Sequence, residues 1–113
     1  MNKCIIIGNL TRDPELRTTG EGINVCTFKV AVNKRTSRDH PEADYFRVVA
    51  WRELGENCAK FLTKGKKVMV AGPVSVNAYE GKDGNHYAEL EITAGEVEFI
   101  SPKDSDSGGG VER

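Results

Sequence analysis

The sequence predicts an all-β protein, a five-stranded Greek-key barrel with one helix between the third and fourth strands. Two observations support this prediction. Most of residues 3–100 alternate apolar and polar side chains with the two-residue period of half-buried strands, and the stretch 53–64 changes to helical spacing. A chain of 113 residues is also the right size for one domain with one core.

The first two strands differ in pattern. Residues 3–10 form a short β-branched apolar run, which is typical of a strand buried on both faces or paired at an interface. Residues 11–22 form a polar loop in which 15–18 could be extended. Residues 25–33 alternate regularly. The side chains predicted to point inward are Cys26, Phe28, Val30 and Val32.

The third strand, 43–51, follows the basic loop 34–43 and has an unusual outer face. Its inward side carries Phe46, Val48 and Ala50, which make an ordinary core face. Its outward side carries, in order, Tyr45, Arg47, Val49 and Trp51. Two large rings around an arginine therefore lie where polar residues are expected.

A helix is predicted over residues 53–64, because the apolar side chains there recur at i, i+4, i+7 and i+8. This stripe consists of Leu54, Cys58, Phe61 and Leu62. Acidic residues occur in its first turn and lysines in its last, as the helix dipole favours, and Gly65 can end it in the left-handed conformation.

Two long strands complete the barrel, at 66–79 and 86–100, joined by a hairpin turn at 80–85. Gly72-Pro73 predicts a bend in the first, because proline cannot donate to a ladder. The side chains predicted to face inward are Val68, Val70, Val74, Val76, Ala78, Ala88, Leu90 and Ile92. This order of elements is that of the OB-fold, whose outer face and loops often hold an oligonucleotide or an oligosaccharide.

Charge is distributed unevenly along the chain. Residues 1–79 carry thirteen Lys or Arg against eight Asp or Glu, and residues 80–113 carry three against nine. The net charge of −1 is therefore the sum of a basic part, residues 1–79, and an acidic part, residues 80–113. A polyanion is expected to bind the basic part. Residues 101–113 lack apolar periodicity and are predicted to form a disordered tail after a domain at 1–100.

The outward rings predict binding of a single nucleic-acid strand. Tyr45 and Trp51 lie about 20 Å apart on one strand, at ~3.3 Å per residue, and Tyr79 lies on the outer side of another. Exposed bases stack on such rings, and phosphates seek cations. The candidate cations are Lys29, Lys34, Arg35, Arg38, Arg47 and Lys67. The alternative is that the rings pack under a loop or in a subunit interface.

No catalytic, metal or cofactor site is predicted. The histidines, His40 and His86, form no ligand pair with each other or with the three cysteines, which we expect to be buried reduced thiols. Phosphate-binding glycine loops are absent from the sequence. No apolar run approaches the ~18 residues that a membrane span needs, and no signal peptide is recognisable, so we expect a cytoplasmic protein.

Four segments resemble the bacterial-type single-stranded DNA-binding protein family. They are "NKCIIIGNLTRDPELR", "FKVAVN", "DYFRVVAW" and "AKFLTKGKKVMVAGPV", and the likeness runs in order over residues 2–100. Members of that family are OB-folds, usually homotetramers, that coat single-stranded DNA in replication, recombination and repair. The resemblance implies the same fold, partner and nucleoid-associated location for this chain.

Carried over by position, the resemblance makes Tyr45, Trp51 and Tyr79 the stacking residues. Thr36 stands where the family often has another aromatic, which implies one stacking platform fewer. The first strand is expected to pair with its copy in a dimer that pairs again. The subunit interface is then expected to include Lys3, Cys4, Ile5, Ile6, Ile7 and Phe46.

The end of the chain departs from longer family members, which close in an acidic tip with an apolar pair that docks onto replication and repair enzymes. Here the last residues are "GGGVER", so recruitment of those enzymes through the tail is not supported. The sequence leaves open a naturally short form, as on phages or mobile elements, or a shortened chain. Two rival functions also stay open: an OB-fold module for RNA or a protein partner, and an oligomer whose outward rings face another subunit.

Overall fold

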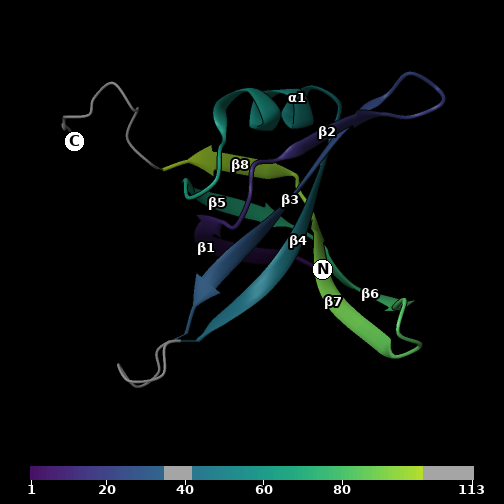
Figure 1. Ribbon diagram of the computed structural model, residues 1–113. Coiled ribbons are helices and arrows are strands. Elements are labelled where there is room, and N and C mark those ends of the chain that lie inside the picture. Colours follow the sequence, from purple (N-terminus) through teal and green to yellow (C-terminus); the bar gives the residue numbers. More distant parts are fainter. Residues whose placement is uncertain (35–41, 101–113) are drawn as a thin grey trace.

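The computed structural model describes residues 1–34 and 42–100 (Figure 1). The predictions for Arg35, Thr36, Arg38 and residues 101–113 therefore lie outside the described residues. The elements in chain order are β1 (Cys4–Leu10), β2 (Glu15–Thr18), β3 (Asn24–Asn33), β4 (Ala43–Trp51), α1 (Arg52–Phe61), β5 (Lys67–Gly72), β6 (Val74–Glu80), β7 (His86–Thr93) and β8 (Glu96–Phe99). The predicted all-β class, with a helix before the last two long strands, is confirmed.

The strands form one closed circuit. β3 pairs antiparallel with β1 on one side and with β4 on the other, and β4 pairs in parallel with β7. β5 pairs with both β1 and β8, and β6 pairs with β7. Because β5 continues into β6 across Pro73, and β7 into β8 across residues 94–95, these four segments are two long bent strands. With β1, β3 and β4 they make the five-stranded barrel of the OB-fold, and β2 is an additional short strand on β3.

The barrel interior is filled by the predicted inward faces of β3, β4 and β5, together with Ile6 and Leu10 of β1. Val30, Val48, Val68 and Val70 are fully buried, and Cys26 and Cys58 join them. Burial raises the pKa of Cys26 to about 11 and that of Cys58 to about 12, because the interior disfavours a charged thiolate. Both cysteines are free thiols, as is the half-buried Cys4. Cys26 and Cys58 therefore behave as small apolar core residues.

Gly8 explains how β1 and β3 cross so closely. A β-carbon at this position would collide with the backbone carbonyl of Ala31 and with the Val30 side chain. The ladder between β1 and β3 is accordingly short and joins Asn9 to Ala31 and Leu10 to Val30. Residues 4–8 thus pair with β5 on one side, and their other edge has no partner strand among the described residues.

The helix is shorter than predicted. It ends at Phe61 rather than at residue 64, and Leu62 is already extended, with φ −101° and ψ 144°. Leu62 is buried as expected, but the prediction that Phe61 belongs to the buried stripe is wrong, because its side chain is 55% exposed and packs against the Phe99 ring. Gly65 has a φ of +89° in the turn after the helix, where the chain reverses into β5.

The β6–β7 hairpin corrects a second prediction. Val76, Ala78, Ala88 and Leu90 were expected to face the core, yet all four are exposed, and only Ile92 of β7 is fully buried. The hairpin extends past the barrel, away from the end covered by α1 (Figure 1). Alternation decides on which face of the ladder a side chain lies, but no described element lies opposite that face once the hairpin has left the barrel.

Candidate nucleic-acid interface

Tyr45 and Trp51 lie on the outer face of β4, as the alternation predicted. Their side chains are 56% and 44% exposed, so neither ring belongs to the core. Arg47 and Val49 lie between them on the same face. The opposite face of the strand is the core face, where Val48 and Ala50 are fully buried. The rings are therefore displayed by a strand whose other side is fixed in the barrel interior.

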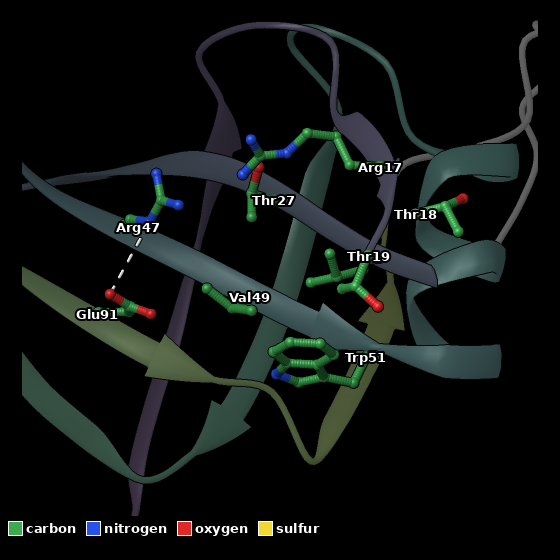
Figure 2. Close-up of a pocket in the computed structure, with 9 residues that line it drawn as sticks. Arg17, Thr18, Thr19, Thr27, Arg47, Val49, Trp51 and Glu91 are labelled. Atoms are coloured by element: carbon green, nitrogen blue, oxygen red, sulfur yellow. Dashed lines mark ion pairs between the residues drawn. The ribbon is translucent and has the colours of Figure 1, made fainter. Parts of the chain in front are cut away.

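A hollow of about 410 Å³ opens beside Trp51. Figure 2 shows Val49 and Trp51 of β4 facing the same space as Arg17 of β2 and as Arg47 with Glu91. Its full lining is Arg17, Thr18, Thr19, Val25, Thr27, Arg47, Val49, Trp51 and Glu91. An indole, a small apolar floor, threonine hydroxyls and guanidinium groups are the chemistry that a nucleobase and its phosphate can use.

Arg17 is a candidate that the sequence reasoning missed. It lies opposite Val25 in the β2–β3 ladder, and this pairing brings it to the Trp51 hollow. The predicted extended piece at 15–18 was the available signal, since its pairing with the next strand would have placed Arg17 beside the binding face. The direction in which that piece folds back is a tertiary property, and the local pattern does not contain it.

A second hollow, of about 730 Å³, lies beside Tyr45. Thr27 and Arg47 line both hollows, so the two are neighbours on one face. The residues that line the second hollow are Thr11, Arg12, Asp13, Pro14, Glu15, Thr27, Phe28, Lys29, Tyr45 and Arg47. Each hollow thus combines one exposed ring with cationic side chains, and Arg47 belongs to both.

Three of the predicted cations face carboxylates of this chain. The Nζ of Lys29 is 3.8 Å from Oε1 of Glu89, and the Nε of Arg47 is 3.9 Å from Oε1 of Glu91. The Nζ of Lys34 is 3.5 Å from carboxylate oxygens of both Glu42 and Asp44. These two carboxylates, Asp44 most strongly, raise the pKa of Lys34. The face is therefore less positive than its lysines and arginines alone suggest.

Tyr79 lies near the tip of the β6–β7 hairpin and does not stand alone. It is 47% exposed, and its ring stacks on that of Tyr87, with centroids 5.7 Å apart and an interplanar angle of 26°. The Tyr87 hydroxyl donates a hydrogen bond of 2.6 Å to Asp83 in the turn. That bond is the main cause that lowers the pKa of Asp83. Sequence reasoning missed Tyr87, although a turn centred on Asp83-Gly84 places it directly opposite Tyr79.

The residues predicted for a subunit interface lie in or just before β1, except Phe46 of β4, and those of β1 alternate between its two faces. Ile5 and Ile7 are 60% and 50% exposed and point outward, whereas Ile6 is buried in the core of its own chain. Alternation turns the Ile6 side chain inward, so in the predicted pairing of β1 with a second copy Ile6 would contribute its backbone, and Ile5 and Ile7 their side chains. Lys3 is exposed, Cys4 is half-buried, and Phe46 packs against the core from a half-buried position. Lys67 is exposed at the start of β5.

The described residues contain neither a cluster of metal ligands nor a membrane-spanning helix. Residues 1–34 and 42–100 contain no group of three or more His, Cys, Asp or Glu that could hold a metal ion. In the same part of the chain, no helix has the length and apolar character needed to cross a membrane.

The barrel with an outward aromatic and cationic face defines an OB-fold of the kind that presents a ligand-binding outer surface. Comparison with known proteins specifies it further. The Single-strand binding protein family matches residues 1–100, and the chain belongs to that family.

Two relatives and one solved structure illustrate the likeness. Single-stranded DNA-binding protein 3 of Listeria innocua is 42% identical over 111 residues, which cover 96% of this chain and 69% of that protein. Single-stranded DNA-binding protein 1 of Staphylococcus aureus is 38% identical over 108 residues, which cover 94% and 69%. The crystal structure of a small single-stranded DNA-binding protein from Streptomyces coelicolor superposes with a TM-score of 0.75 at 25% identity, covering 86% of this chain and 92% of that one.

Proposed function

We propose that this protein binds single-stranded DNA without sequence preference, by stacking bases on Tyr45, Trp51 and Tyr79 and by contacting phosphates with cations of the same face. The observation that carries the proposal is the outer face of β4, where two half-exposed rings flank Arg47 beside two neighbouring hollows. Every base has a flat face, so stacking tolerates any sequence, at ~1–3 kcal/mol per base. Family membership supports the same partner.

The phosphate contacts are assigned to Arg47, Lys29 and Arg17, which line the hollows. The sequence-based candidates Lys34 and Lys67 belong to the same proposal at longer range, with Arg35 and Arg38 of the loop before β4. We place the protein with the bacterial DNA in the cytoplasm, where it coats and protects single strands during replication, recombination and repair. In this role it acts as a binding protein and not as an enzyme.

A homotetramer, built as a dimer of dimers, is part of the proposal. Residues 4–8 of β1 have an edge without a partner strand in the described part of the chain, and the exposed Ile5 and Ile7 flank it on the outer face. An apolar strand with such an edge invites pairing with another chain, and a second copy of β1 would satisfy it. A sizing measurement that gave a stable monomer would remove this part of the proposal without touching the DNA-binding face.

The test uses the chain's single tryptophan, Trp51, whose fluorescence reports on one hollow. Adding oligo-dT should quench it strongly, and added salt should weaken the effect because phosphate binding releases counterions. Duplex DNA of equal length should quench little, since its bases are already stacked. An equal response to duplex, or no response to either, would refute the stacking proposal. An RNA oligomer of the same length tests the rival OB-fold RNA module, which would prefer RNA through its 2′-hydroxyls.

A further inference from the structure

Two carboxylates lie on the proposed DNA-binding face. Glu89 and Glu91 belong to β7, the strand that pairs in parallel with β4. Their side chains are 21% and 26% exposed, whereas those of Lys29 and Arg47, their ion-pair partners, are 50% and 36% exposed. The anions are therefore held lower in the surface than the cations and are less free to swing away from them.

The ion pairs occupy the centre of the face. In the ladders, Lys29 lies opposite Arg47, and Arg47 lies opposite Glu91. Because β4 lies between β3 and β7, the Lys29–Glu89 pair crosses the outer face of β4, which displays both β4 rings. Arg47 lines both hollows, and Glu91 lines the one beside Trp51. A phosphate that reaches Lys29 or Arg47 therefore also meets a carboxylate.

These four side chains carry no net charge together, and this has a physical consequence. A phosphate gains full attraction from Lys29 or Arg47 only if it displaces the carboxylate, and otherwise it is repelled by that carboxylate at short range. Charge alone then contributes little at the centre of the face. A ligand that also stacks bases on Tyr45 and Trp51 gains energy that a bare polyanion or a duplex cannot.

We propose that Glu89 and Glu91 are specificity-determining residues that occupy Lys29 and Arg47 in place of phosphate, so that only a strand with stackable bases binds this face well. The inference rests on the proposed function. It adds that the carboxylates of Glu89 and Glu91 make the face discriminate against duplex DNA. Such a repulsive element is a general means of specificity. It weakens the binding of duplex DNA more than that of a single strand, because the duplex has the higher density of phosphate charge and gains no stacking in return.

The experiment compares wild type with Glu89→Gln, Glu91→Gln and the double variant. Glutamine keeps the shape of the side chain and removes its charge. Each single change should tighten oligo-dT binding roughly two- to five-fold at low salt, as the loss of one surface ion pair implies. In the double variant the slope of log affinity against log salt should steepen by up to about 1.4, since each further phosphate neutralised on a single strand contributes ~0.7. Duplex affinity should rise by a larger factor than oligo-dT affinity.

A matched control separates this local effect from a change in total charge. The double variant Glu53→Gln and Glu98→Gln removes the same two charges from exposed positions on α1 and β8. It should leave the salt slope and the preference for single strands close to those of wild type. Size-exclusion chromatography of all variants checks that assembly is unchanged.

The outcomes distinguish the inference from the proposed function. If wild type binds oligo-dT and the Glu89 and Glu91 variants bind it equally or more weakly, the carboxylates orient the cations or do nothing, and the inference is wrong while the function stands. The inference is also wrong if the control double variant gains as much affinity as the test variant. If wild type does not bind oligo-dT, the proposed function fails and the inference fails with it.

Discussion

The outer face of β4, here called the wall, and the β6–β7 hairpin both carry exposed aromatic side chains, but the surroundings of these rings differ. On the wall, neither Trp51 nor Tyr45 stacks on another ring of residues 1–34 and 42–100, and each lies beside a hollow, with Arg47 between them. At the hairpin, Tyr79 is already stacked on Tyr87, and the turn beside them holds the carboxylate of Asp83. An exposed ring with cations beside it can stack a nucleobase and place the phosphate near positive charge. A ring that already stacks on another ring has only its other face left for a base.

The two regions also differ in what holds them in place. The reverse side of the wall is the core, so β4 cannot move without disturbing Val48 and Ala50. The reverse side of the hairpin carries Val76 and Leu90, which are exposed. We infer that the wall holds its rings in a fixed position, whereas the hairpin extends the binding surface beyond the barrel and is held less firmly. The following predictions test this difference, from the largest expected effect to the smallest.

The largest contrast concerns stability along one face of β7. Ile92→Ala should lower the free energy of unfolding by about 2–5 kcal/mol, because it removes a fully buried side chain and leaves a cavity. Leu90→Ala, two residues away but 41% exposed, should cost less than about 1 kcal/mol. Urea denaturation of both variants provides the measurement. Similar losses would mean that the hairpin is as firmly packed as the wall.

The second contrast concerns binding by the rings. Trp51→Ala should weaken oligo-dT binding by about 1–3 kcal/mol without unfolding the domain, since the ring is outside the core. Tyr79→Ala should weaken it less, because Tyr87 can offer its newly exposed face to a base. The double variant Tyr79→Ala and Tyr87→Ala should then lose more than the two single losses combined. Fluorescence anisotropy of a labelled oligo-dT follows all of these proteins. Strict additivity would refute the shared role of the two tyrosines.

The smallest effect belongs to Arg17, the cation that tertiary structure adds to the wall. Arg17→Gln should reduce oligo-dT affinity by a factor of a few and lower the magnitude of the salt slope by about 0.7, as expected when one phosphate contact is lost. Lys82→Gln, in the hairpin turn, is the control with the same change of charge. If Lys82→Gln lowered the salt slope more than Arg17→Gln, phosphates would contact mainly the hairpin and not the wall.

Local patterns predicted the wall better than the hairpin. In β3 and β4 the alternation correctly separated the core face from the face that carries Tyr45, Arg47 and Trp51, because both strands stay within the barrel along most of their length. The same alternation over β6 and β7 assigned Val76 and Leu90 to the core and was wrong. A period of two defines two faces of a strand, but burial also requires another element opposite the inward face.

The site shows the same division. Tyr45, Trp51 and Tyr79 were predicted as outward rings from single strands, and all three are exposed. The partners of those residues come from elsewhere in the chain: Arg17 from β2, Tyr87 from β7, and the carboxylates that pair with Lys29 and Arg47. The turn at Asp83-Gly84 could have indicated the Tyr79–Tyr87 pair, because the two strands are consecutive. The ion pairs and the hollow that Arg17 lines are not visible in a local window, since they form between strands that are distant in sequence.

By itself, the sequence determined the class of fold, the order of the elements and the rings that β4 turns outward, because each depends on the spacing of side chains along one segment. Only the tertiary structure decided where the barrel ends and the hairpin begins, and which cations face carboxylates before any ligand arrives. Those properties depend on the closure of strands into a barrel, which sets residues from distant segments within a few ångströms of one another.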